Sequence, residues 1–269
     1  MQIGISNIAW EPVEDGAVAA TLTARCIDCI DIAPGKYFPD PGAVSHDAVA
    51  RVRDAWLAHG IRLHGMQALL FGTSGLNLFG DDGRMFDRLA AVCRLGGRLG
   101  IGPLTFGSPR NRDRGGLSDR QAEDEAVRFF RRVADVAADA GVTLCLEPNP
   151  AVYNCNFMVT TDETAAIVRA VDRPAIRLQL DVGAIALNGE DPAATIAAHA
   201  DLIGHVHASE PGLAAMGEAD APHAAAAAAL RHHRPDLPVT IEMVATQGPQ
   251  APRIARSVEF IQSMYGAVS

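Results

Sequence analysis

The sequence predicts an α/β protein that folds as one (β/α)8 TIM barrel, a single domain over residues 1–269. Its length of 269 residues is normal for such a barrel, which typically has ~250 residues. Strand-like runs alternate with helical patterns eight times, which implies a parallel sheet. No change in composition marks a linker. A doubly wound open sheet is the alternative, but it usually has a glycine-rich turn after its first strand, and ISNIAWEP contains no such turn.

Each expected strand is a short run rich in apolar and β-branched residues, as buried parallel strands are. In the fifth run, Val142, Leu144 and Leu146 occupy alternate positions, and Pro148 stops the strand. The expected strands cover residues 2–10, 27–33, 61–69, 103–106, 142–146, 176–180, 203–207 and 238–243.

The expected helices are bounded by capping residues. Ser45 precedes the second helix, and Gly60 and Gly100 follow the second and third, as glycine often does just past a helix end. Thr160 and Glu163 have the spacing of a capping box. The expected helices cover residues 14–24, 45–59, 79–99, 118–141, 160–171, 193–200, 223–232 and 252–265.

The composition excludes several classes of function. The formal net charge of −9 argues against a nucleic-acid partner, because phosphate contacts from Lys and Arg supply most of that affinity. Lys36 is the one lysine in the sequence, so a Schiff-base mechanism has a single candidate. Hydrophobic residues make up 48% and charged residues 20% of the chain, which are values of globular proteins.

The cysteines and the N-terminal segment bear on the cellular compartment. Cys26 and Cys29 form one C-x-x-C pair at the start of an apolar strand. Because no second pair exists, we expect core packing, with a redox or zinc role as the alternative. MQIGISNIAW lacks a basic segment followed by an apolar run, and no stretch approaches the ~18 apolar residues of a membrane helix. We therefore expect a cytoplasmic protein without a membrane partner.

Charged or imidazole side chains end four successive expected strands. Glu147 follows VTLCL, Asp181 follows RLQL, His207 ends IGHVH and Glu242 lies within VTIEM. The carboxyl ends of barrel strands open on one face, so these four side chains are expected to converge. Each one alone has a structural alternative, as a cap or an ion-pair partner. Together they indicate a site.

Three carboxylates and one imidazole suit a divalent cation of intermediate hardness. Mn²⁺ is the favoured ion, and Mg²⁺ and Co²⁺ also suit this donor set. Zn²⁺ remains an alternative, although sets of thiolates or several histidines fit it better.

The motifs around these residues are LEPNP at Glu147, LDVG at Asp181, GHVHASE at His207 and TIEM at Glu242, separated by 34, 26 and 35 residues. On these motifs the chain resembles the xylose-isomerase-like TIM barrels of the sugar phosphate isomerase/epimerase family, particularly the branch that includes D-tagatose 3-epimerase. The resemblance covers essentially the whole chain. It implies a divalent metal held by the four residues, with Glu147 and Glu242 exchanging protons with the substrate.

The predicted activity is that of an isomerase acting on a sugar or sugar phosphate. Proton transfer next to a carbonyl creates an enediolate, whose negative oxygen needs a cation close by. Two carboxylates that act as acid and base give epimerisation, and one that shuttles a proton between neighbouring carbons gives isomerisation. A metal-dependent dehydratase or lyase of an inosose-like substrate and a non-catalytic ligand-binding barrel are the alternatives.

The chain departs from the family pattern at two places. Members commonly have a histidine three residues after the aspartate, where this chain has Ala184. The epimerases tend to have an arginine a few residues after the SE of the seventh-strand motif, where this chain reads PGLAAMG. Both changes remove substrate contacts and leave the metal ligands in place, so the substrate and the reaction stay open.

Several polar residues near the strand ends are candidates for substrate contact. His205 lies two residues before His207, so both project to the same side of the strand. Arg110 and Arg112 follow the fourth strand, and arginine forks match the oxygens of a phosphorylated sugar. Each candidate has an alternative as a packed core group, a surface ion pair or an exposed loop residue. The candidates are His64, Gln67, Arg110, Arg112, Tyr153, Asn156, His205 and Glu210.

The expected partner is a small carbohydrate. Trp10 and Phe71 are candidates for an apolar wall against its carbon skeleton, with core packing as the alternative. The oligomeric state stays open, and a homo-oligomer is compatible with the sequence.

Overall fold

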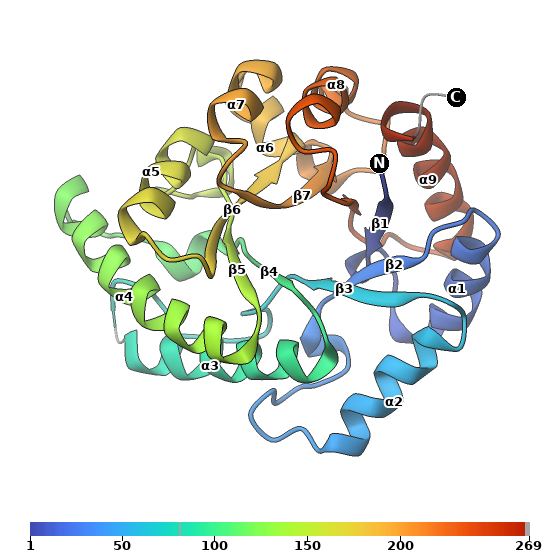
Figure 1. Ribbon diagram of the computed structural model, residues 1–269, viewed down its shortest axis with the longest axis horizontal. Coiled ribbons are helices and arrows are strands. Elements are labelled where there is room, and N and C mark those ends of the chain that lie inside the picture. Colours follow the sequence, from blue (N-terminus) through green and yellow to red (C-terminus); the bar gives the residue numbers. More distant parts are fainter. Residues whose placement is uncertain (81, 267–269) are drawn as a thin grey trace.

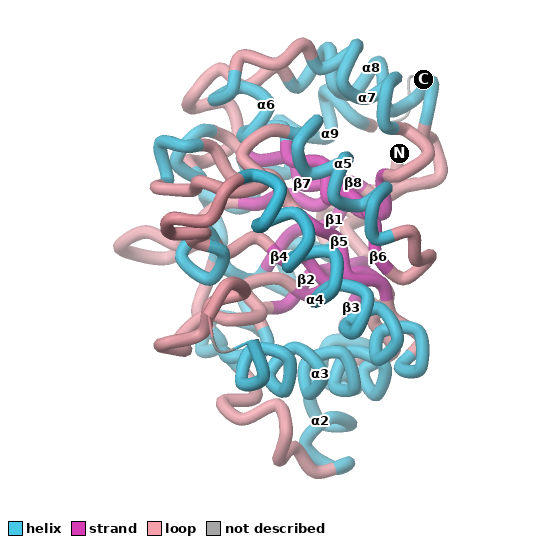
Figure 2. The backbone as a smooth tube through the Cα atoms, turned by 90° about the vertical axis from the view of Figure 1, so that its left-hand side faces the viewer, coloured by secondary structure: helices cyan, strands magenta, loops and turns pink. Residues whose placement is uncertain are grey.

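Eight parallel strands close into a barrel in the computed structural model, which describes residues 1–80 and 82–266. The strands follow one another around the barrel in chain order, from β1 to β8, and β1 pairs with β8 to close it. Helices surround the strands in Figure 1, and Figure 2 shows helices above, below and in front of the central strands. The structure confirms the (β/α)8 barrel that the alternation of strands and helices predicts.

The strands have nearly the expected positions, and most are shorter than expected. The first strand ends at Ser6, because the Ser6 hydroxyl accepts a hydrogen bond from the Ile8 N–H and starts a 3₁₀ turn over Asn7–Ala9. The seventh is longer than expected and reaches Ser209. The strands are β1 Ile3–Ser6, β2 Cys29–Ile32, β3 Arg62–Met66, β4 Pro103–Phe106, β5 Thr143–Leu146, β6 Ile176–Asp181, β7 Ile203–Ser209 and β8 Val239–Glu242.

The helices include one that the sequence analysis did not predict, α6 directly after β6. Asp181 caps it by accepting hydrogen bonds from two backbone N–H groups of its first turn. Residue 81 of the expected third helix and residues 267–269 of the expected domain lie outside the described residues. The helices are α1 Asp15–Thr23, α2 His46–Leu57, α3 Asp82–Leu99, α4 Asp119–Ala140, α5 Thr161–Val171, α6 Val182–Asn188, α7 Pro192–His199, α8 His223–His233 and α9 Ala251–Tyr265.

The expected capping box at α5 forms only in part. The Thr160 hydroxyl accepts from the Glu163 N–H at 3.1 Å, as expected. The Glu163 carboxylate instead accepts from the Val159 N–H at 2.7 Å, one residue before the cap. No helix in residues 1–80 and 82–266 is both long and apolar enough to cross a membrane.

Two register shifts bring polar residues into the barrel. One lies between Ile30 and Asp31 in the pairing of β2 with β3, and the other between Leu178 and Gln179 in the pairing of β6 with β7. Asp31 and Gln179 are both buried. A bulge re-aims the side chain at which it occurs, so these shifts matter for the groups beneath the strand ends.

Close packing of α3 on α4 depends on Gly97. A Cβ at this position would lie 2.2 Å from the carbonyl oxygen of Ala140, the last residue of α4. Alanine normally stabilises a helix interior by about 0.5–1 kcal/mol relative to glycine. Overpacking against fixed backbone costs about 1–3 kcal/mol. The clash therefore outweighs the gain in helix propensity.

We expect Gly97→Ala to lower the free energy of unfolding by about 1–2 kcal/mol in denaturant titrations, the net of these two terms. Gly102→Ala is the matched control, because a Cβ there meets no atom within 4 Å. If the Gly97→Ala protein were as stable as wild type, α3 and the end of α4 would have to move apart without a cost in free energy, and the expectation would be wrong.

Candidate metal centre

Four ionisable side chains converge at the carboxyl ends of β5 to β8. Glu147 follows β5, Asp181 ends β6, His207 lies in β7 and Glu242 ends β8. One ligand atom from each lies within 4.8 Å of the others, and all four residues are buried. The strand pairing sets this arrangement, because Asp181 lies opposite His207 in the β6–β7 pair.

His207 lies between the two glutamates. Its Nδ1 is 3.1 Å from Glu147 Oε1 and 3.4 Å from Glu242 Oε2. One oxygen of each glutamate therefore faces the centre. The other oxygens have amide neighbours, since Gln67 Nε2 donates to Glu242 Oε1 at 2.8 Å and Asn149 Nδ2 to Glu147 Oε2 at 3.4 Å.

Asp181 is held through a single oxygen. Its Oδ1 accepts from the N–H groups of Gly183 and Ala184, at 2.8 and 3.1 Å, and from the Ser209 hydroxyl. These hydrogen bonds fix the orientation of the carboxylate, and none of them involves Oδ2. Glu147 is anchored through its backbone, because the buried Arg112 donates from Nη1 to the Glu147 carbonyl at 2.7 Å.

Burial and the close approach of charged groups together set the electrostatics of the site. Burial, with the nearby charges of Glu147 and Glu242, raises the pKa of Asp181 to about 7. Burial alone would lower the pKa of His207, but the Glu242 charge and hydrogen bonds to carboxylates raise it well above its ordinary value. Burial would raise the pKa of Glu242, but the charge and hydrogen bond of His207 lower it.

A divalent cation would relieve this crowding. Three carboxylates and one imidazole, each offering an atom within 4.8 Å of the others, fit an ion such as Mn²⁺ or Mg²⁺. Glycine at position 107 leaves the room that Glu147 needs, since a Cβ there would lie 1.8 Å from Glu147 Oε2. Neither metal-capable cluster found among the described residues contains a cysteine.

A cavity of about 650 Å³ lies over the centre. Glu147 and Glu242 line it, whereas Asp181 and His207 are not among the lining residues. One side of the cavity is apolar and is formed by loops. Two backbone hydrogen bonds join these loops: the Val244 N–H donates to the Leu213 carbonyl, and the Ala245 N–H donates to the Ile8 carbonyl. The two glutamates are therefore the members of the four that a ligand in the cavity would meet.

Two of the eight candidate substrate residues, Gln67 and Arg110, line the cavity. Arg110 is exposed at the mouth, and the structure assigns it no ion-pair or hydrogen-bond partner within residues 1–80 and 82–266. Phe71 also lines the cavity with 77% of its surface exposed, while Trp10 is fully buried and donates to Asp15 Oδ1 at 2.8 Å.

Three other candidates lie inside the barrel or directly behind the strand ends. His205 is buried beneath the centre, 3.1 Å from Asp31 Oδ2. The ring of His64 lies 5.5 Å from that of His205, and its Nδ1 is 3.3 Å from Arg62 Nη1. Arg112 is buried and binds the Glu147 carbonyl. None of these three candidates is among the residues that line the described cavity.

The remaining three candidates organise loops. Both oxygens of Glu210 accept backbone N–H groups, from Gly217 at 2.7 Å and Ala221 at 2.9 Å, and its side chain is buried. Tyr153 accepts the Gly212 N–H at its hydroxyl. Asn156 donates to Asp113 Oδ1 at 2.7 Å. Their side chains are thus engaged within the protein and do not line the described cavity.

The sequence analysis did not identify Asn149, Ser209 and Asp31. Ser209 is two residues after His207 in β7, so the period of two in a strand places it beside a predicted ligand. Asn149 follows Glu147 by two residues in the loop after β5, where no strand period applies. Asp31 lies near the end of the apolar run IDCIDIA. Like the four predicted ligands, Asp31 is a charged residue near the end of a strand, so the sequence pattern that predicted those ligands also applies to it.

The chain is similar to known proteins in sequence and in fold. Residues 21–264 match the family model of the xylose isomerase-like TIM barrel. The L-ribulose 3-epimerase of Methylomonas sp. (strain DH-1) is 30% identical over 132 residues, so the match spans 49% of this chain and 46% of that protein.

Two solved structures share the fold across nearly the whole chain. The D-psicose 3-epimerase of Clostridium cellulolyticum H10, solved with D-tagatose, has a TM-score of 0.83 at 17% identity and covers 99% of this chain and 100% of that one. The D-allulose 3-epimerase of Methylomonas sp., solved with D-allulose, has a TM-score of 0.78 at 22% identity and covers 98% and 97%. At these identities the likeness concerns the fold.

We expect the metal-free protein to lose stability as the pH rises above about 6.5, because below that pH the lowered pKa of His64 changes the stability in the opposite direction. Asp181 and His207 both have raised pKa values in the folded state. Each group contributes stability below the pKa that it has in the unfolded chain. This contribution is lost as the pH rises through the pKa that the group has in the folded protein. Unfolding titrations of chelated protein measure this loss.

Saturating Mn²⁺ should remove this loss, because metal binding displaces the protons from its ligands. Asp181→Asn keeps an oxygen to cap α6 and should show a shallower pH dependence. A chelated protein whose stability is constant or increases over this range would contradict the assignment.

Proposed function

Because the chain belongs to the xylose isomerase-like TIM barrel family, we propose that it is a divalent-metal-dependent isomerase or epimerase of a keto sugar, with Mn²⁺ as the favoured ion. One observation carries the proposal. Of the four converging residues, Glu147 and Glu242 line the cavity, and Asp181 and His207 stand behind them. All four would hold the metal, and the two glutamates would also act on the substrate.

In this proposal Glu147 and Glu242 are the acid and the base. One oxygen of each faces His207, and the other lies toward a residue of the cavity wall: Glu147 Oε2 toward Gly107, and Glu242 Oε1 toward Gln67. One glutamate removes a proton from the carbon next to the carbonyl at its outer oxygen, and the other returns a proton to the substrate. A bound divalent cation would stabilise the negative charge that develops on the carbonyl oxygen.

Neighbouring groups would orient the two glutamates. Gln67 donates to Glu242 Oε1, which holds the carboxylate rotamer and opposes protonation at that oxygen in the resting state. Asn149 approaches Glu147 Oε2 at the longer distance of 3.4 Å. The two carboxylates therefore have unequal hydrogen-bond support.

The cavity walls bear on the class of substrate. Ile8, Leu213 and Val244 make one side apolar, and apolar surface suits the carbon skeleton of a sugar rather than its hydroxyl groups. Leu213 belongs to the segment after β7 in which the family commonly has an arginine. Arg110 and Ser108 belong to the polar part of the lining. We propose that Arg110 receives a hydroxyl or phosphate group of the substrate.

Replacing either glutamate should slow proton exchange with the substrate. We expect Glu147→Gln and Glu242→Gln each to slow solvent deuterium incorporation into the substrate by roughly 10²–10⁴, the contribution of a positioned acid or base. Mass spectrometry in D₂O measures it, with L-ribulose, D-allulose and D-tagatose and their phosphates as probes. Glu218→Gln is the control, since Glu218 is exposed and does not line the cavity.

Each contrary outcome of that experiment identifies a different error. Full epimerisation of a substrate by either glutamine variant would contradict the two-glutamate scheme. A product lighter than its substrate by one water would indicate the dehydratase alternative. Bound metal in the wild-type protein with no deuterium uptake from any probe would indicate a ligand-binding barrel.

A phosphorylated substrate should depend on Arg110. We expect Arg110→Ala to raise KM for a keto sugar phosphate roughly 10- to 100-fold, because a hydrogen bond to a charged group contributes about 1.5–3 kcal/mol. The KM for the uncharged sugar should change by no more than about twofold. Steady-state kinetics with both forms measure this difference. Equal effects on the two forms would mean that Arg110 does not select a phosphate.

A further inference from the structure

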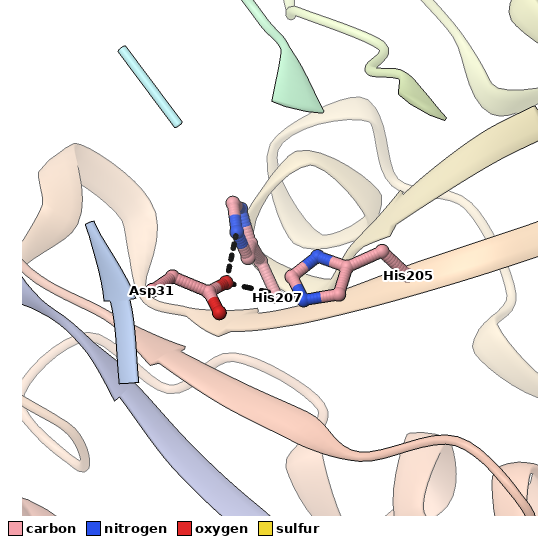
Figure 3. A group of neighbouring side chains, drawn as sticks. All are labelled: Asp31, His205 and His207. Carbon is pink, nitrogen blue, oxygen red and sulfur yellow. Dashed lines mark ion pairs between the residues drawn. The ribbon is translucent and has the colours of Figure 1, made fainter. Parts of the chain in front are cut away.

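A second group of buried ionisable residues lies directly beneath the candidate metal centre. Asp31 of β2 lies beside His205 and His207 of β7, with one carboxylate oxygen facing both rings (Figure 3). Asp31 Oδ2 is 3.1 Å from His205 Nε2 and 3.9 Å from His207 Nε2. All three residues are almost completely buried, and none lines the cavity. The catalytic scheme above does not use Asp31 or His205.

The fold makes a specific place for this carboxylate. The register shift between Ile30 and Asp31 occurs at this residue. On the neighbouring strand, Gly65 leaves room for it, because a Cβ at position 65 would lie 2.6 Å from Asp31 Oδ1. A carboxylate that is 1% exposed is costly unless its charge is compensated. Its presence here therefore calls for a partner.

His205 is held on both edges of its ring. Nε2 faces Asp31 at 3.1 Å, and Nδ1 lies 3.1 Å from Gln179 Oε1. Gln179 Oε1 in turn accepts the Thr105 hydroxyl. His205 is therefore engaged with groups of the barrel interior, and it holds Asp31 against β7.

His207 presents its two ring nitrogens to different surroundings. Nδ1 faces Glu147 and Glu242 in the centre. Nε2 is buried without a hydrogen-bond partner in the described structure, and the carboxylate on its side is that of Asp31. A neutral imidazole that binds a cation through Nδ1 must carry its proton on Nε2. That proton points into the barrel, where it needs an acceptor.

We infer that Asp31 is a positioning residue, held by His205, which accepts the Nε2–H of His207 and so directs the Nδ1 lone pair of His207 at the metal. The inference rests on the proposed metal centre and extends it to a fifth side chain. Carboxylates that take the second N–H of a ligating histidine fix its tautomer and its orientation, and their loss typically weakens metal binding 10- to 100-fold. The 3.9 Å separation requires a small movement of His207 or Asp31 when the metal binds.

The same three residues could instead be ligands of a second cation, since their donor atoms lie within 4.8 Å of one another. Two features favour the positioning role. Asp31 and His205 approach each other directly, at an ion-pair distance of 3.1 Å, and the other nitrogen of His205 already has a protein partner. The cluster is also sealed beneath the strand ends and away from the cavity. Metal stoichiometry distinguishes the two roles.

The test compares Mn²⁺ affinity in Asp31→Asn and wild-type protein by titration calorimetry. Asparagine keeps the shape and loses the charge, so we expect affinity to fall roughly 10- to 100-fold in a protein that remains folded by circular dichroism. Asp28→Asn is the matched control, because Asp28 lies three residues earlier and its carboxylate is exposed, bonded to Gln2. It should bind Mn²⁺ like wild type.

A double-mutant cycle tests whether Asp31 acts through His207. In a His207→Gln background, Asp31→Asn should reduce Mn²⁺ affinity by less than about twofold further, since coupled residues are not additive. A merely structural role would lower the melting temperature and leave the metal affinity of the folded protein unchanged. An equal loss in both backgrounds would overturn the inference, and so would two ions per wild-type chain and one in Asp31→Asn.

The wild-type protein provides a test that requires no variant. In ¹⁵N-histidine-labelled protein loaded with diamagnetic Mg²⁺, His207 should carry its proton on Nε2, and an Nδ1–H tautomer would overturn the inference. Different results would contradict the proposed metal centre and the positioning role of Asp31. If the wild-type chain binds no divalent ion, the metal centre itself is wrong. If it binds Mn²⁺ and Asp31→Asn binds it equally well, only the positioning role is wrong.

Discussion

Repulsion among three buried carboxylates around one imidazole is the interaction on which the rest of the site depends. Glu147, Asp181 and Glu242 each end or follow a different strand, and the closed barrel leaves them within 4.8 Å of one another and of His207. Such a group is unfavourable without added positive charge. Burial and the two glutamate charges raise the pKa of Asp181, and the carboxylates around His207 raise the pKa of its ring. A bound divalent cation would displace these protons and supply the positive charge instead.

The groups around this centre are arranged in layers. Above it, Glu147 and Glu242 line a cavity that has an apolar side and is also lined by Arg110. At its own level, backbone N–H groups of α6 and the Ser209 hydroxyl hold Asp181. Below it, Asp31 and His205 occupy the barrel interior. In the proposed scheme, proton transfer, metal binding and orientation of the ligands would each depend on a different one of these layers.

Glycine has a structural role wherever a carboxylate must fit against a strand. Position 107 leaves room for Glu147, and position 65 leaves room for Asp31, with distances from a hypothetical Cβ of 1.8 and 2.6 Å. These glycines lie in or directly after the neighbouring strands β4 and β3. The barrel thus accommodates buried acids by removing a side chain from the adjacent strand, which keeps the acids close to the centre.

By itself, the sequence determined the barrel and its four convergent residues, because strand and helix periods are local and the carboxyl ends of barrel strands always share a face. It also predicted Gln67 and Arg110 near the cavity. Only the tertiary structure decided which polar residues reach that cavity: Glu210, Tyr153 and Asn156 have partners within loops, and His205 lies beneath the strand ends. The physical reason is that loop geometry and register shifts aim side chains, and both depend on contacts between segments distant in the chain.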